Sequence, residues 1–152
     1  MDKALLEKLL REHPSAQTFG MGAEYLPEWA EQTLEYLDSV AEEVVSIGYD
    51  YPVEGGEYAV LEKCRTPVGV IWRVRWAGGA PGAEHAGYEL YRRFEDAKRS
   101  LVSTIRSWMK DIREAMISLE EAGAERDIEH YRGELDKLRE QLKVLKSLHP
   151  WD

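Results

Sequence analysis

The apolar positions of residues 95–148 follow two long helical patterns. Within each pattern the apolar residues recur at alternating steps of three and four, and the turn Ala122-Gly123-Ala124 separates the two patterns. Heptad spacing on both sides of a glycine turn is typical of antiparallel helices packed along their length. We therefore predict a helical hairpin with arms of roughly 35–42 Å. Its apolar seams are Leu101, Ile105, Trp108, Ile112, Ala115 and Leu119 in the first arm, and Ile128, Tyr131, Leu135, Leu138, Leu142 and Leu145 in the second.

Residues 1–48 predict two amino-terminal helices. The first covers residues 2–12, which place four leucines on one side, and Pro14 ends it. The second starts at Pro27, whose fixed φ suits the first helical position, and its apolar residues keep helical spacing through Ile47 to Gly48. Residues 15–25, with two glycines, are predicted to form a loop.

The period changes to that of β-strands within residues 57–94. Residues 57–64 alternate, and in the next strand Trp72 and Trp76 fall on one face while Arg73 and Arg75 fall on the other. The aromatic-rich segment 88–94 predicts a third strand. Asp96 would then cap the first arm of the hairpin.

These elements predict an α+β fold with the order α-α-β-β-β-α-α. A small three-stranded antiparallel sheet packs on helices, and the chain ends in the long antiparallel helical hairpin. We expect a single domain over residues 1–152, made of amino-terminal helices (1–48), a β-meander (57–94) and the hairpin (95–148). The tryptophan face of the meander should pack on helices. The exposed part of the hairpin seam should be covered either by the amino-terminal helices, of which the second is long enough to cover most of one arm, or by a second copy of the chain in a dimer.

The net charge of −9 is unevenly distributed. Residues 1–61 carry an excess of ten negative charges, whereas residues 62–113 carry an excess of five positive charges. An acidic chain disfavours generic attachment to nucleic acid or to a membrane surface. The sequence contains no apolar run of the roughly 18 residues that a membrane span needs. With one cysteine it excludes an internal disulfide framework, so we expect a cytoplasmic protein without membrane contact.

No pattern in the sequence marks a catalytic or metal-binding constellation. The four histidines lie far apart without helical ligand spacing, and the glycine pairs match no phosphate-binding motif. We therefore expect no metal, no cofactor and no enzymatic activity. Positive charge from Lys63 and Arg65 would favour the thiolate of Cys64, but a lone strand cysteine usually behaves as a small core residue, and we expect the latter.

Two groups of charged residues are candidates for binding. The basic group, on and after the predicted strands, could contact phosphates or an acidic partner, although pairing with the acidic helix at 28–43 would neutralise it. The second group is acidic. Together with a tryptophan beyond the last helix, it could contact a protein partner. The basic candidates are Arg73, Arg75, Arg92 and Arg93; the protein-interaction candidates are Glu28, Glu31, Glu35, Asp38, Glu42 and Trp151.

The leading functional hypothesis is a non-enzymatic interaction or regulatory protein. It would bind another protein, or a second copy of itself, through the hairpin or the acidic amino-terminal helices. A small accessory or inhibitory protein of a phage or mobile element would have these properties, as would a bacterial adaptor. The alternatives are a nucleic-acid-binding module with a basic sheet face, and an acidic inhibitor whose carboxylates mimic nucleic acid.

Overall fold

The computed structural model describes residues 1–19, 26–50, 56–78 and 85–149. Four helices and five strands follow one another in the order α-β-α-β-β-β-β-α-α. The elements are α1 (Lys3–Glu12), β1 (Ser15–Phe19), α2 (Glu28–Ser39), β2 (Ala41–Asp50), β3 (Gly56–Thr66), β4 (Gly69–Gly78), β5 (His85–Tyr91), α3 (Phe94–Ala122) and α4 (Glu125–Ser147).

The five strands form one antiparallel sheet with the order β1-β5-β4-β3-β2. Strands β2 to β5 form a meander, and β1 joins its far edge, with Ser15 in register with Glu89. The α+β class and the three predicted strands are therefore confirmed. The predicted number of strands and the predicted order were wrong, because the sheet also contains β1 and β2.

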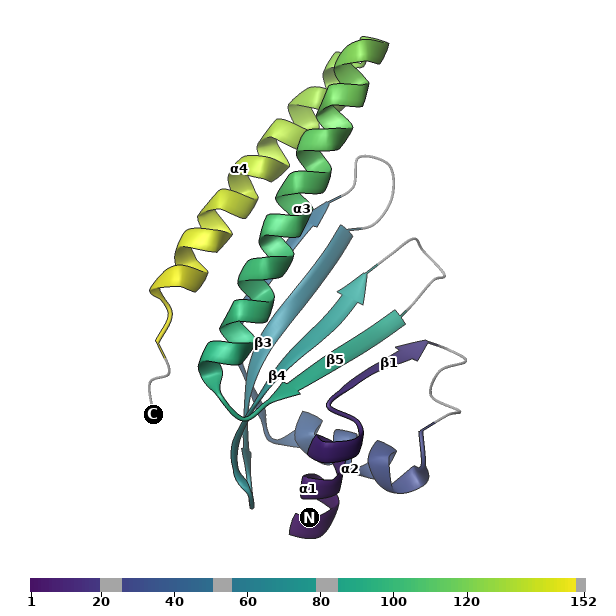
Figure 1. The fold of residues 1–152 in the computed structure, drawn as a ribbon, viewed down its shortest axis with the longest axis vertical. Coiled ribbons are helices and arrows are strands. Elements are labelled where there is room, and N and C mark those ends of the chain that lie inside the picture. Colours follow the sequence, from purple (N-terminus) through teal and green to yellow (C-terminus); the bar gives the residue numbers. More distant parts are fainter. Residues whose placement is uncertain (20–25, 51–55, 79–84, 150–152) are drawn as a thin grey trace.

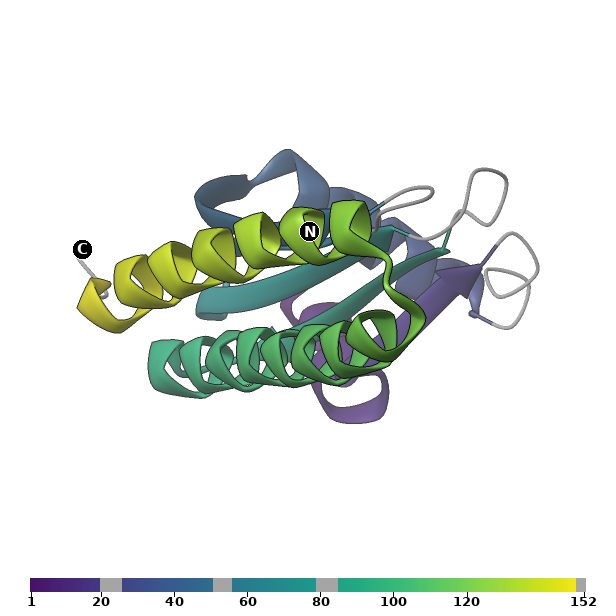
Figure 2. The ribbon, with the colours of Figure 1, turned by 90° about the horizontal axis from the view of Figure 1, so that it is seen from above.

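Helices cover both faces of this sheet (Figures 1 and 2). The α3–α4 hairpin packs on one face, here called the hairpin face, with Leu61, Trp72 and Val74 in the shared core. Helices α1 and α2 pack on the other face, here called the N-terminal face, against a core that includes Cys64 and Ile71. The expectation that α2 covers a hairpin arm is thus wrong, because the sheet separates them.

The hairpin is confirmed, with arms of 29 and 23 residues. At 1.5 Å per residue these arms measure about 43 and 35 Å. Gly123 ends α3 with a φ of +71°, a left-handed conformation that glycine adopts without strain. The tip of the hairpin projects beyond the sheet (Figure 1), and there the seam residues Ala115 and Leu119 are only partly buried.

Three local predictions were wrong. The second helix ends at Ser39 instead of continuing to Ile47, because residues 41–50 pair with β3 as a strand. Part of the predicted loop 15–25 forms β1, since pairing with β5 satisfies its backbone groups. Arg93 occupies the cap position of α3 and makes no side-chain cap, whereas Asp96 lies in the first turn, where its charge suits the helix dipole.

Candidate functional site

The basic residues of β4 form an ion-pair network on the N-terminal face. Arg73 is 3% exposed, and its Nη1 lies 2.7 Å from Asp38 of α2 while its Nη2 lies 2.9 Å from Glu62 of β3. The other Glu62 oxygen accepts a 2.7 Å hydrogen bond from Arg75 Nε. Burial opposes the charge of Arg73, but the bond to Glu62 and the neighbouring carboxylates raise its pKa above the ordinary value. The expected pairing with the acidic helix is present for Arg73, whereas Arg75 pairs with β3.

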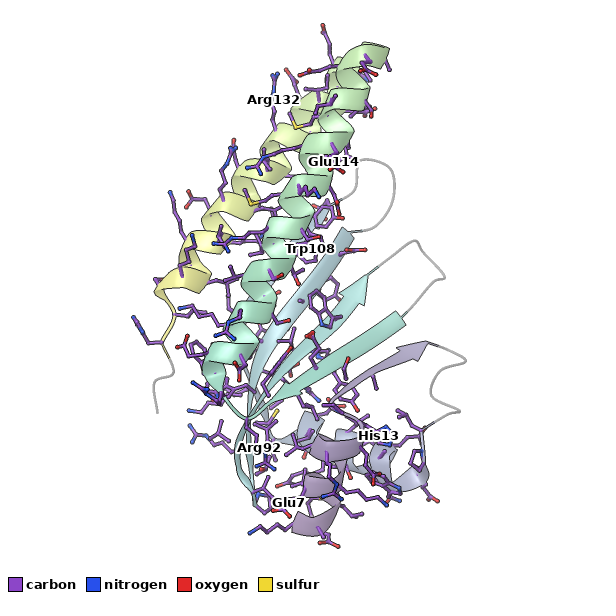
Figure 3. All side chains as sticks on the ribbon, in the orientation of Figure 1. Glu7, His13, Arg92, Trp108, Glu114 and Arg132 are labelled. Carbon is purple, nitrogen blue, oxygen red and sulfur yellow. The ribbon has the colours of Figure 1, made fainter. Side chains whose placement is uncertain are left out.

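The remaining basic candidates lie elsewhere. Arg92 and Arg93 are exposed at the junction between β5 and α3, near the lower end of α3 in Figure 3, where Arg92 is labelled. Because Arg73 is buried and neutralised, the four arginines do not form one exposed row. Of these four arginines, Arg75, Arg92 and Arg93 are exposed and could contact a phosphate group.

Helix α2 presents four exposed carboxylates and contains no basic residue. Spacings of three, four and three place them along one side of the helix. Only Asp38 has an ion pair within the described residues. Glu42 does not join this stripe, because it lies in β2, in register with Lys63. Trp151 lies outside the described residues. The α2 stripe is therefore Glu28, Glu31, Glu35 and Asp38.

The structure also shows a pocket that the sequence reasoning missed. A cavity of about 320 Å³ lies on the hairpin face of the sheet, among residues of β1, β3, β4 and β5. Gly87 is the cross-strand partner of Trp76, and both residues line the cavity. We call this cavity the Trp76 pocket; it is lined by Ser15, Ala16, Glu57, Trp76, Ala77, Gly87, Tyr88 and Glu89.

Two carboxylates of the Trp76 pocket are held by neutral donors. Glu57 Oε2 accepts a 3.0 Å hydrogen bond from Trp108 Nε1, and Glu89 Oε1 accepts bonds of 2.6 Å from the Tyr91 hydroxyl and 2.8 Å from Ser100 Oγ. Burial and the bond to Glu89 raise the pKa of Tyr91, which keeps this donor protonated. No lysine or arginine of the described residues forms an ion pair with either carboxylate. Both carboxylates are therefore held in place without a compensating cation from the described residues.

An aromatic row positions the wall of the pocket. The ring of Trp108, under α3 in Figure 3, lies 4.9 Å from that of Tyr49 and 6.2 Å from that of Trp76, meeting the latter nearly perpendicularly at 88°. Such edge-to-face contacts are favourable and restrict ring orientation. Trp76 is the outermost of the three and only partly buried. A fixed indole beside two carboxylates suits a cationic group, which both the ring and the charges attract.

The sequence carried a weak signal for this pocket. Glu57 and Glu89 each occupy a position on the apolar side of a strand, since Ala59 and Tyr91, two residues further on, belong to the hairpin-face core. An acid at such a position is unusual and can mark a site. From the sequence, Trp76 could be interpreted only as a core residue. Gly87 lies beside it only through the register between β4 and β5, which the sequence does not show.

Cys64 is a core residue, as expected. Its side chain is fully buried on the N-terminal face, and burial raises the pKa of the thiol to about 11 although Arg73 acts in the opposite direction. A buried, protonated thiol is a poor nucleophile. The structure therefore gives Cys64 a packing role.

Among the described residues, no group of three or more histidine, cysteine, aspartate or glutamate side chains is arranged to hold a metal ion. Within the same ranges, no helix combines the length and apolar character needed to cross a membrane. Comparisons with protein-family models, with curated proteins and with solved structures found no match to this chain.

Proposed function

We propose that this chain is a non-enzymatic interaction protein that binds a basic segment of a partner protein through the Trp76 pocket. The observation that carries the proposal is the pair Glu57 and Glu89, held by neutral donors beside Trp76 without a cation. Uncompensated charge in a partly enclosed site interacts more strongly with a counter-charge than charge on an open surface does. A lysine or arginine side chain supplies that charge and can stack on the indole, a contact of about 0.5–2 kcal/mol.

A protein is a better fit to this pocket than a free small cation. Ser15 and Ala16 of the edge strand β1 line the cavity, so a side chain inserted there can belong to a segment that lies along this edge. The net charge of −9 would also attract a basic partner over long distance. We propose a regulatory role in the cytoplasm for such binding, as in an accessory or inhibitory protein of a phage or mobile element.

The α2 stripe supports a second candidate surface. Its four carboxylates could meet a basic protein surface or occupy a partner's nucleic-acid site. Three of them, at Glu28, Glu31 and Glu35, have no ion pair among the described residues. The stripe lies on the N-terminal side of the sheet, whereas the pocket lies on the hairpin face, so substitutions can separate the two surfaces.

The structure gives less support to direct nucleic-acid binding. Arg73 would have to leave two carboxylates before contacting a phosphate, and breaking a buried charge network is costly. The exposed arginines that remain lie on an acidic molecule. Duplex binding that weakens steeply with salt would favour this alternative over protein binding.

A titration with a short oligoarginine peptide tests the pocket. We expect the peptide to shift the NMR signal of the Trp76 indole in the full chain. The double substitution Glu57→Gln/Glu89→Gln should weaken binding at least about tenfold, which corresponds to about 1.4 kcal/mol. Glutamine keeps the shape and one acceptor oxygen on each side chain, so the pocket should remain intact.

The matched control is Glu28→Gln/Glu31→Gln, which removes the same charge from the α2 stripe. Affinity of this control should stay close to that of the unchanged chain. If the control loses binding and the pocket variant keeps it, the α2 stripe is the interaction surface and the pocket proposal is wrong. Equal small losses in both variants would indicate attraction by net charge alone and would also contradict it.

A homodimer through the hairpin is a further proposal for the partner. The hairpin exposes Ile117 by 60% and Val144 by 48%, the largest exposed fractions among its big apolar side chains in the described residues. Burying them against a second copy would remove apolar surface from water. Light scattering over a wide concentration range should then give a mass above 17.5 kDa, whereas a constant monomer mass would contradict the dimer.

A further inference from the structure

The two edges of the sheet differ in how their backbone N–H groups are covered by side chains. At the β2 edge, the backbone N–H groups of Gly48 and Asp50 donate to the side chains of Gln141 and Glu134 from α4, at 2.8 and 2.9 Å. A β-bulge between Glu43 and Val45 disturbs the rest of that edge. Side-chain cover and bulges are ordinary means of blocking an edge against pairing. At the β1 edge, the described residues provide no such cover.

The alternation of hydrogen bonds along β1 identifies which of its backbone N–H and C=O groups do not pair with β5. Leu90 N donates to Pro14 O at 2.7 Å, which makes Pro14 and Leu90 a hydrogen-bonded position of the antiparallel ladder. Such positions alternate along a strand, so Ala16 also exchanges bonds with β5. Ser15 and Gln17 then direct their backbone N–H and C=O groups away from β5. No described residue pairs with these groups.

We propose that the basic partner segment adds to β1 as a sixth strand and sends its cationic side chains over Ser15 into the Trp76 pocket. This inference rests on the proposed function and specifies the binding mode. Strand addition provides main-chain hydrogen bonds for affinity, and alternate side chains provide specificity. The open edge and the anionic pocket adjoin each other, because Ser15 and Ala16 line the cavity.

The register fixes which side chains reach the pocket. Cross-strand partners share a face, so Ser15 lies on the hairpin face together with its partner Glu89. An added residue opposite Ser15 would point to the same face, about 10 Å from β5, which is two strand spacings. The long stems of lysine and arginine are suited to this span, and the small Ser15 side chain leaves the path open. Charge complementarity with Glu89, on β5, selects basic residues at these positions, while Glu57, on β3, lies two strands further away and attracts them only at longer range.

The other side of the added strand has a different requirement. Ala16, which shares the N-terminal face with Tyr88, packs against the apolar core under α1 and α2. Side chains opposite Ala16 would therefore meet apolar surface. The segment that fits is an extended one in which basic residues alternate with apolar or small residues.

Selection from a displayed library of eight-residue peptides, with the full chain as target, tests this binding mode. We expect enrichment of peptides with alternating lysine or arginine. The substitution Gln17→Pro should reduce their affinity at least about tenfold, since it removes an outward N–H that the β1–β5 ladder does not use. N-methylation of alternate peptide amides should cause a similar loss, because it blocks pairing while leaving every charge in place.

The outcomes separate the binding mode from the proposed function. Peptides that depend on Glu57 and Glu89 but bind equally well to the Gln17→Pro variant would overturn strand addition and leave the pocket proposal standing. Peptides indifferent to Gln17→Pro and to Glu57→Gln/Glu89→Gln would overturn both. Failure to select any peptide with the alternating pattern would also overturn strand addition. Hydrogen exchange of the β2–β5 amides serves as the check that Gln17→Pro keeps the sheet.

Discussion

The side-chain amide of Gln141 on α4 is hydrogen-bonded to both backbone groups of Gly48 on β2. Its Oε1 accepts from Gly48 N at 2.8 Å, and its Nε2 donates to Gly48 O at 3.0 Å. This is the pairing that another strand would offer at one residue. Glu134 accepts from Asp50 N two residues further along the same edge. The hairpin therefore closes the β2 edge in addition to covering the sheet face.

Replacing Gln141 by alanine should destabilise the chain by about 1–3 kcal/mol, because two partly buried hydrogen bonds are lost and Gly48 is left without partners. The reopened edge should also increase self-association. Urea unfolding measures the first effect and light scattering the second. Lys143→Ala on the same helix, which removes only an exposed ion pair, is the control and should change stability little.

In the ion-pair network of Arg73, substitution of a buried member should reduce stability more than substitution of the exposed member. Arg73→Met should cost about 3–5 kcal/mol, because it leaves the buried Glu62 with Arg75 alone. Asp38→Asn should cost at most about 1 kcal/mol, since Asp38 is 63% exposed. Denaturant unfolding of the two variants checks the contrast. Similar losses in both would show that Asp38 is essential to the network.

Trp108 should combine a packing role with a positioning role. Trp108→Ala should destabilise the chain by about 3–5 kcal/mol, since the ring is buried between α3 and the sheet. Trp108→Phe should cost less but should remove the Nε1 donor of Glu57. We expect this second variant to weaken oligoarginine binding while remaining folded. Unchanged binding would mean that Glu57 does not need this donor.

Alkaline pH should destabilise the fold through Tyr88. Burial raises the pKa of Tyr88 to about 12, although Arg73 acts in the opposite direction, and the hydroxyl donates to His13 O at 3.0 Å. Because the native state holds this proton more tightly than the unfolded state, the stabilisation is complete below pH 10. It is lost as the pH rises from about 10 to about 12, up to about 2–3 kcal/mol. Thermal unfolding should show a shallower alkaline decline for Tyr88→Phe than for the unchanged chain.

The hairpin could be predicted because its signal is local and repeated. Each seam residue of α3 and α4 is followed by another three or four positions later, and Gly123 ends the pattern with a turn. Strand β4 was equally predictable, since Val70, Trp72, Val74 and Trp76 occupy every second position. In both cases the period of the sequence equals the period of the buried face.

Strand β2 could not be recognised in the same way. Its bulge between Glu43 and Val45 lets Val44 and Val45 both pack near the hairpin-face core, so strict alternation is absent. The apolar residues of this segment therefore continue the helical spacing of α2. In the folded chain, the β propensity of Val44, Val45 and Ile47 outweighs this spacing, because β3 is available for pairing. The Trp76 pocket could not be predicted from the sequence either, because its residues come from β1, β3, β4 and β5 and meet only through the sheet register.

The pairing of β1 with β5 has a consequence for the newly made chain. About 70 residues separate Ser15 from Glu89, which is its partner. At roughly 5–20 residues per second, the ribosome needs about 4–14 s to synthesise that interval. Throughout this time the leucines of α1 lack Tyr88 and Leu90, against which they pack in the finished core. The nascent chain therefore exposes the apolar side of its first helix and the pairing edge of its first strand until β5 has been made.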